Sequence, residues 1–246
     1  MEGLSVGSVL LTGCDGGLGL GLLKGLLEQP SPPRHLFAAC VDPQGKGRGH
    51  QPVPKPSCSL ADVTDPNSIK AAVERVREKV GSAGLNLLVN NTSTTRRSTL
   101  ATETAENMSL VYTTNTIGPL QTTQAFLPLL KEAAEAEGQH EMSCSRAAII
   151  NISSILGIWG SPPLGFPPQL AMAALNMLTK CLALEYGNNG ILCVSMEPAF
   201  HHTMGGIGAG PVTVEESVRG VLQLLTQLSA TSNGTFWDWR GQRLPW

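Results

Sequence analysis

The chain has 246 residues, 41% of them hydrophobic and 15% charged, which suits a single α/β domain spanning residues 1–246. Its formal net charge of -2 offers no basic surface, so we expect no nucleic-acid partner. The longest apolar run, around Gly17 to Leu27, is short and interrupted by Lys24 and several glycines. We therefore expect no membrane span.

The cysteines and the start of the chain bear on its cellular compartment. Met1 to Gly7 lacks the basic start and the long apolar stretch of a secretory signal. The six cysteines form no Cys-x-x-Cys pair. We interpret them as reduced, buried, small hydrophobic residues of a cytoplasmic protein, and we expect no metal site.

Short apolar runs alternate with longer segments of helical pattern along the chain. Near-continuous rather than alternating hydrophobicity is typical of strands that are covered on both faces. Such runs predict strands at Ser8 to Thr12, His35 to Cys40, Cys58 to Asp62, Leu85 to Asn90, Ala147 to Ser153 and Ile191 to Glu197.

Three helices between or after these strands carry clear signals. Asp65 and Pro66 open a helix to about Lys79, because an acidic cap followed by proline favours a helix start. A long helix is expected from Glu103 to Glu137, with a bend at Gly118-Pro119. Thr213 and Glu216 form a capping box for a helix that runs through Leu228. The alternation predicts an α/β fold with a Rossmann-type, doubly wound parallel sheet.

A glycine-rich segment comes directly after the first strand and opens the first helix: Thr12-Gly13-Cys14-Asp15-Gly16-Gly17-Leu18-Gly19. Glycines at these spacings let the backbone turn tightly and approach a pyrophosphate at the helix N-terminus, where free N–H groups favour anions. Its position in a strand–turn–helix makes a dinucleotide site a better interpretation than a bare turn.

The Thr-Gly-x-x-x-Gly-x-Gly spacing resembles that of the short-chain dehydrogenase/reductase family, and the resemblance continues along the chain. It implies that the cofactor contacts include Thr12, Gly13, Gly17, Leu18 and Gly19. Asp62-Val63 looks like the pair that contacts adenine, and Asn90-Asn91-Thr92-Ser93 stands where the family has Asn-Asn-Ala-Gly. Pro198-Ala199, with Thr203 shortly after, resembles the segment that contacts the nicotinamide amide. Arg146 to Gly157 and Leu192 to Ser195 look closest to sniffer-type carbonyl reductases and bacterial C-factor proteins.

The same resemblance implies a catalytic Asn115 and a catalytic Ser154, but the expected Tyr-x-x-x-Lys pair is missing. Ala173 to Thr179 matches the segment that comes after the family's Lys, which places Met172 at the Lys position and Pro168 at the Tyr position. In the family the Tyr hydroxyl moves a proton to or from the carbonyl oxygen, and Lys lowers its pKa from about 10. Without the pair, we expect hydride transfer to be very slow.

Several of these residues also have purely structural interpretations. Ser153 and Ser154 could be simple strand-end hydroxyls, and Asn115 could only support a helix bend. His201 and His202 could supply a replacement acid, because histidine titrates near neutral pH, or they could be solvated loop residues.

Neither nicotinamide cofactor is well specified. Where sniffer-like relatives place arginines that hold the 2′-phosphate, this chain has Gly16 and Val41, and Asp15 adds negative charge nearby. The second strand ends in Cys40 rather than in an Asp that would hold the ribose hydroxyls of NAD, and Asp42 follows two residues on. We expect weakened NAD(P)(H) binding with a mild preference for NAD(H).

Three functions remain open at this point. The chain could be a catalytically impaired relative that acts by binding a dinucleotide. It could be an active carbonyl oxidoreductase that uses a substitute acid, such as His202 or Ser154 with water. It could also be a partner-binding scaffold that has lost the cofactor. A small carbonyl compound is the expected substrate class, and a homodimer through the two long helices is expected from the family.

Overall fold

The computed structural model describes residues 3–41, 57–60, 62–96, 98–136, 138, 141–157, 166–199 and 212–246. Within these ranges the strands form one sheet in the order β3-β2-β1-β4-β5-β6-β7-β8, in which only β8 is antiparallel to its neighbour. The strands are β1 (Ser8–Thr12), β2 (His35–Cys40), β3 (Ser57–Leu60), β4 (Leu87–Asn90), β5 (Ala148–Ile152), β6 (Leu192–Glu197), β7 (Thr235–Asp238) and β8 (Arg243–Leu244). The predicted doubly wound α/β fold is confirmed.

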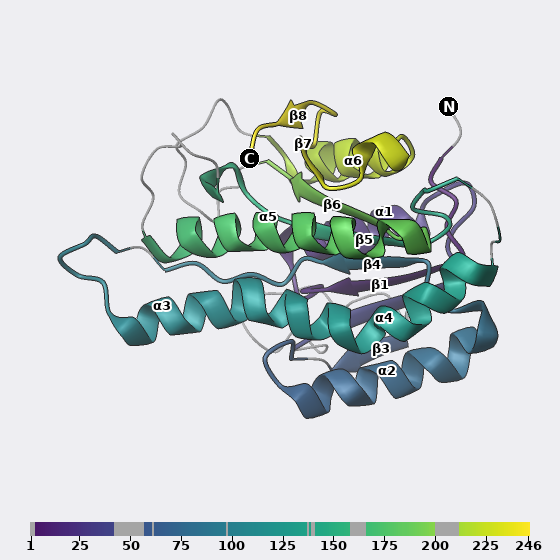
Figure 1. The fold of residues 1–246 in the computed structure, drawn as a ribbon, viewed down its shortest axis with the longest axis horizontal. Coiled ribbons are helices and arrows are strands. Elements are labelled where there is room, and N and C mark those ends of the chain that lie inside the picture. The colour runs from purple at the N-terminus through teal and green to yellow at the C-terminus, as the bar shows by residue number, and fades with distance from the viewer. Residues whose placement is uncertain are drawn as a thin grey trace.

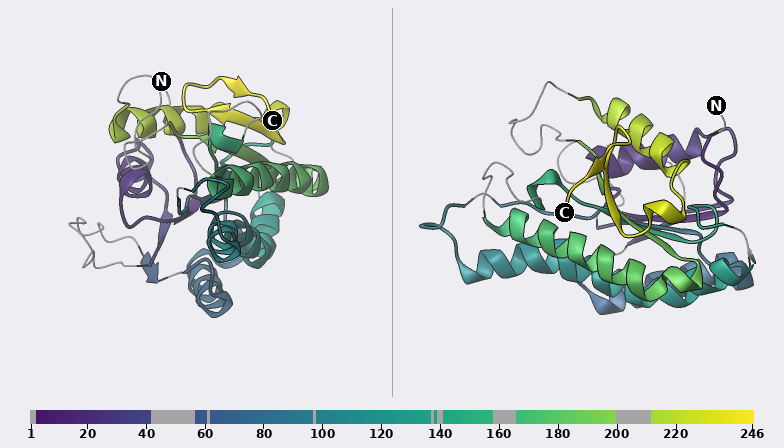
Figure 2. Two further views of the ribbon diagram at one scale, coloured as in Figure 1. Left: turned by 90° about the vertical axis from the view of Figure 1, so that its left-hand side faces the viewer. Right: turned by 45° about the horizontal axis from the view of Figure 1, so that its top comes forward.

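Helices cover both faces of this sheet (Figures 1 and 2). One face carries α1 (Gly17–Leu27) and α6 (Val214–Leu225), and the other carries α2 (Pro66–Val80), α4 (Gly118–Ala136) and α5 (Phe166–Tyr186), with α3 (Ala105–Tyr112) against α5. Successive residues of β1 divide between the two layers, since Val9 and Leu11 join the first core and Leu10 joins the second. Among the described helices, none has the length and apolarity needed to cross a membrane.

The long helix predicted from Glu103 to Glu137 is interrupted. A π-helical turn, Thr113–Ile117, separates α3 from α4, so the irregularity lies just before the predicted bend at Gly118-Pro119. Thr104 caps α3 by accepting a hydrogen bond from the Asn107 N–H at 3.1 Å.

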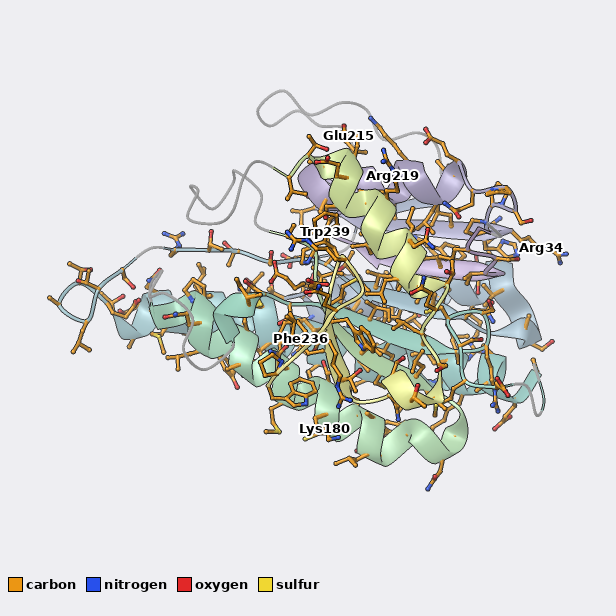
Figure 3. The ribbon with its side chains drawn as sticks, turned by 90° about the horizontal axis from the view of Figure 1, so that it is seen from above. Arg34, Lys180, Glu215, Arg219, Phe236 and Trp239 are labelled. Carbon is orange, nitrogen blue, oxygen red and sulfur yellow. The ribbon has the colours of Figure 1, made fainter. Side chains whose placement is uncertain are left out.

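The sequence did not predict β7 and β8. They extend the sheet beyond β6, and Phe236 of β7 is fully buried and stacks on Trp246 with ring centroids 6.2 Å apart. Figure 3 shows Phe236 next to α5, the helix that carries Lys180. The same view shows Trp239 beside α6. Two short strands with few residues each lack the long apolar run that marks the central strands.

A chain of buried polar side chains joins the central strands to α5. The Asn90 side-chain amide donates to the side-chain Oδ1 of Asn151 at 2.9 Å, and the Asn151 side-chain amide donates to the Thr179 hydroxyl at 2.8 Å. The Ser195 hydroxyl also donates to Thr179, which in turn donates to the Leu175 carbonyl oxygen. The four polar residues are at most 2% exposed, so each depends on the others for hydrogen bonds that water cannot replace.

We expect Asn151→Ala to lower the free energy of unfolding by about 2 kcal/mol, because it leaves the buried Asn90 amide and Thr179 hydroxyl short of a partner. Chemical denaturation measures the loss. Gln124→Ala on the exposed face of α4 is the control and should change stability by less than about 0.5 kcal/mol. Equal stability of the two variants would contradict a supporting role for this chain.

Candidate functional site

The glycine turn between β1 and α1 depends on close backbone contacts. Gly13 has φ 68°, a left-handed conformation that favours glycine. A Cβ on Gly19 would lie 1.9 Å from the Gly13 carbonyl oxygen, so a side chain at Gly19 would force the turn open. These two positions explain why the sequence has glycine there.

Hydrogen bonds fix the turn to the segment after β4. The Thr12 hydroxyl accepts from the backbone N–H groups of Asn91 at 3.0 Å and Thr92 at 3.1 Å. The Asn91 side-chain amide donates to the carbonyl oxygens of Thr12 at 3.1 Å and Gly13 at 3.0 Å. Thr12 and Asn91 therefore fix the position of the glycine turn relative to the segment after β4.

The N-terminus of α1 faces the same region. Its cap residue, Gly16, provides no side-chain hydrogen bond, and the first turn holds no acidic residue. Gly17 has φ 51°, and a Cβ placed on it would meet no atom within 4 Å. The first N–H groups of α1 are thus left for an anion, and open space lies beside them.

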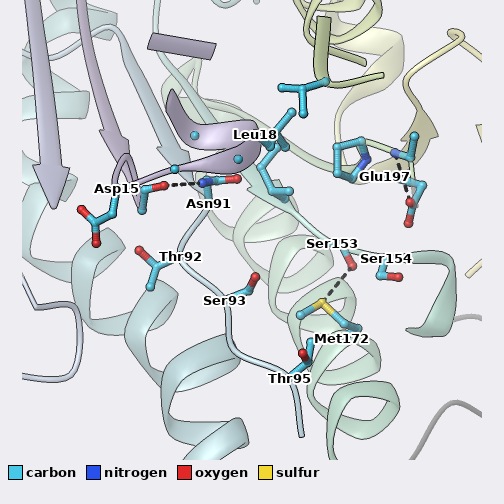
Figure 4. Close-up of a pocket in the computed structure, with 18 of the residues that line it drawn as sticks. Asp15, Leu18, Asn91, Thr92, Ser93, Thr95, Ser153, Ser154, Met172 and Glu197 are labelled. Carbon is cyan, nitrogen blue, oxygen red and sulfur yellow. Dashed lines mark hydrogen bonds between the residues drawn. The ribbon is translucent and has the colours of Figure 1, made fainter. Parts of the chain in front are cut away.

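A cavity of about 630 Å³ opens at the carboxyl ends of the strands, where β1 lies between β2 and β4. This is the switch point at which doubly wound sheets bind ligands. The close-up shows the turn at one end of the cavity and the serines after β5 at the other (Figure 4). Its walls include Gly13, Asp15, Gly17, Leu18, Gly19, Val41, Asn91, Ser153, Ser154, Pro168, Met172, Glu197 and Pro198.

The first two turns of α5 form an apolar wall of this cavity. Pro168 and Met172 are both buried. The Ser153 hydroxyl donates to the side-chain Oδ1 of Asn176 at 2.7 Å and lies 3.9 Å from the Met172 sulfur. Among the described residues that line the cavity, none is Tyr, Lys, Arg or His. The positions of Pro168 and Met172 therefore offer no proton donor to a bound ligand.

Glu197, at the end of β6, is a pocket residue that sequence reasoning missed. It is 5% exposed and accepts hydrogen bonds from the backbone N–H groups of Ile155 and of Ala199, the latter at 3.2 Å. Burial raises its pKa to about 7, against hydrogen bonds from Ile155, Ala199 and the Ser154 side chain that lower it. A Glu before a proline gives no sign of this burial in the sequence.

Glu197 also supports a strained turn. Ala199 has φ 95°, a conformation in which L side chains are strained, and it stands where the family resemblance implies glycine. Its N–H donates to Glu197, so the buried carboxyl group holds the strand-end turn beside the cavity.

Other predicted site residues lie outside the described cavity walls. The Asn115 side chain donates to the Thr94 carbonyl oxygen and accepts from the Thr94 N–H, both at 2.8 Å, which ties the π-helical turn to the segment after β4. Asn90 belongs to the buried polar chain. The Asp62 carboxylate accepts from the N–H and the hydroxyl of Thr64.

Val63 is buried and packs near Gly118 of α4. Thr203, His201 and His202 lie outside the described residues.

Comparison with known proteins matches residues 8–206 to the family model described as short chain dehydrogenase. The chain belongs to the short-chain dehydrogenase/reductase family. An NADPH-bound carbonyl reductase from chicken fatty liver is 43% identical, with TM-score 0.88, over 99% of this chain and 100% of that one. The carbonyl reductase Sniffer of Drosophila melanogaster is 34% identical, with TM-score 0.89, over 98% and 100%.

Two curated relatives match over shorter lengths. Human retinol dehydrogenase 5 is 31% identical over 217 residues, which cover 87% of this chain and 61% of that protein. The C-signal protein of Myxococcus xanthus is 29% identical over 141 residues, or 57% of this chain and 79% of that protein. The predicted likeness to sniffer-type carbonyl reductases and C-factor proteins is confirmed.

We expect the free energy of unfolding to depend on pH through Glu197. Its pKa in the fold, about 7, lies above its ordinary 4.5, so its contribution to stability is complete below pH 4.5 and is lost as pH rises to about 7. Asp238 on β7 adds to the raised pKa. Glu197→Gln should remove this dependence, which amounts to about 3 kcal/mol. Denaturation at a series of pH values measures this difference. If the free energy of unfolding changed with pH by the same amount in both proteins, the contribution of Glu197 would be ruled out.

Proposed function

We propose that this chain binds a nicotinamide dinucleotide in the cavity and has lost its family's route for proton transfer. The observation that carries the proposal is the start of α5, where Pro168 in the first turn and Met172 in the second line the cavity at the positions that correspond to the family's Tyr and Lys. A protein that binds the dinucleotide but lacks the proton donor would be a catalytically impaired relative of carbonyl reductases.

The described residues suit a dinucleotide. The uncapped N-terminus of α1 and the open space at Gly17 would receive the pyrophosphate, because backbone N–H groups there bind anions. Asn91 would keep the glycine turn in place, and Pro198 and Ser154 would border the nicotinamide end. The bound cofactor would supply the hydride. Met172 fills apolar space beside Ser153 and cannot lower the pKa of a neighbouring hydroxyl.

Loss of the proton donor sets the expected rate. A positioned general acid or base contributes about 10²- to 10⁴-fold to a rate. The names of the similar reductases suggest a small carbonyl compound as the substrate class. We therefore expect this chain to reduce such a compound more slowly, by about that factor, than a relative that has the Tyr and Lys.

A second candidate is an active oxidoreductase with a substitute acid, and Glu197 is the observation that favours it. This carboxyl group lines the cavity, interacts with the Ser154 side chain and has a pKa of about 7. A general acid works best when its pKa lies near the working pH. Carbonyl reduction whose rate tracks the protonation of Glu197 would support this candidate over the first.

Two further proposals concern assembly and location. Leu170, Met177 and Leu184 recur every seven residues along α5 and are 48%, 63% and 71% exposed, which provides an apolar stripe for a homodimer. The cysteine side chains that the structure describes form no disulfide with one another, which suits the reducing cytoplasm, although Cys181 is exposed and not buried as predicted.

Direct titration with NADH and NADPH tests the cofactor proposal. We expect saturable binding, in the micromolar range or weaker, monitored by nucleotide fluorescence or calorimetry. Gly19→Val should abolish it, because the added side chain meets the Gly13 carbonyl oxygen. Ala136→Val, at an exposed residue of α4 outside the described cavity lining, is the control. No binding at millimolar cofactor would overturn the proposal and leave the partner-binding scaffold.

The dimer is tested by light scattering after size exclusion. We expect the wild-type chain to have twice the monomer mass and Met177→Glu to shift it toward the monomer, since a charge at the centre of the stripe resists burial. Lys70→Glu, on the exposed face of α2, should leave the mass unchanged. A monomeric wild-type chain would contradict the dimer.

A further inference from the structure

Asp15 connects the two strands that border the adenosine end of the cavity. It belongs to the glycine turn after β1, yet its Oδ2 atom accepts a hydrogen bond from the Val41 N–H, 3.2 Å away, just after β2. Its other oxygen, Oδ1, is buried and has no hydrogen-bond partner in the described part of the chain. Asp15 and Val41 both line the cavity.

The end of β2 is where dinucleotide-binding sheets hold the adenosine ribose with an acidic side chain. In this chain β2 ends in Cys40, whose side chain is buried, and the next carboxylate in the sequence, Asp42, lies outside the described residues. Asp15 instead brings a carboxylate to the same place from the neighbouring turn. A buried carboxylate oxygen without a donor is costly, so this atom is suited to a ligand hydroxyl.

The described charges around the cavity suit a ribose hydroxyl better than a phosphate. A ribose hydroxyl can donate to Asp15, whereas the 2′-phosphate of NADP(H) has mainly acceptor oxygens and a charge of about -1.5 to -2. The charged side chains that line the described cavity are Asp15 and Glu197, both acidic. No described lining residue offers a cation to balance the extra phosphate.

We infer that Asp15 binds the adenosine ribose hydroxyls and makes this chain select NAD(H) against NADP(H). The inference rests on the proposed cofactor binding. It sets the chain apart from the similar chicken carbonyl reductase, whose structure contains NADPH. Asp15 thereby determines cofactor specificity without belonging to the strand that usually carries this carboxylate.

The test compares dissociation constants for NADH and NADPH in the full-length wild-type chain, Asp15→Asn and Glu197→Gln. The wild-type chain should bind NADH roughly tenfold or more tightly than NADPH, given the repulsion between close like charges. Asn at position 15 keeps the size, can still accept from Val41 and offers an amide donor to a phosphate. This variant should lower the preference by about tenfold or reverse it.

The control and a pair of fragments locate the effect. Glu197→Gln removes an acidic group from the other end of the cavity and should change both constants by a similar factor. The fragments 5′-AMP and 2′,5′-ADP, which lack nicotinamide, should show the same preference and the same response to Asp15→Asn.

The outcomes distinguish failure of the proposed role of Asp15 from failure of the proposed cofactor binding. Tighter NADPH binding by the wild-type chain, or a ratio that Asp15→Asn leaves unchanged, overturns the role of Asp15 while cofactor binding stands. Failure of both dinucleotides to bind at millimolar concentration overturns the proposed function, and the selectivity with it.

Discussion

The site depends on the contact between the glycine turn and the segment after β4. The Asn91 amide donates to two carbonyl oxygens of the turn, and the Thr12 hydroxyl accepts from two N–H groups of the segment. This contact holds the N-terminus of α1 at the mouth of the cavity. The neighbouring Asn90 extends the support into the sheet, through Asn151 and on to α5. The two ends of the cavity are thus positioned by one pair of adjacent asparagines.

The two ends of the cavity differ in what they can do. At the turn, the backbone N–H groups can bind an anion, and the glycines leave space for it because they have no side chains. At the other end, Met172 is a buried apolar group beside Ser153, and the titratable group among the described lining residues is the buried Glu197. The fold tolerates this wall because proline fits the first turn of a helix and methionine packs without polar partners. The stability of the fold therefore does not require Tyr and Lys at the positions of Pro168 and Met172.

The sequence predicted the fold where the local signal was strong. Continuous apolar runs located the central strands, and the capping box at Thr213 is present, with hydrogen bonds in both directions. Glu197 could not be recognised, because its surroundings come from Ile155 and Ala199, which only the folded loops bring together. Asn115 matched a family motif, but its contact with Thr94 depends on a π-helical turn that hydrophobic periodicity does not indicate.

The central claim, that the cofactor pocket persists without its proton donor, is tested most directly by single-turnover hydride transfer. The wild-type chain and a Pro168→Tyr/Met172→Lys variant would be saturated with NADH and mixed with excess 4-nitrobenzaldehyde, and loss of cofactor absorbance would be recorded. We expect slow loss in the wild-type chain and a rate higher by about 10²-fold or more in the variant. Rapid turnover by the wild-type chain, with no gain in the variant, would contradict it.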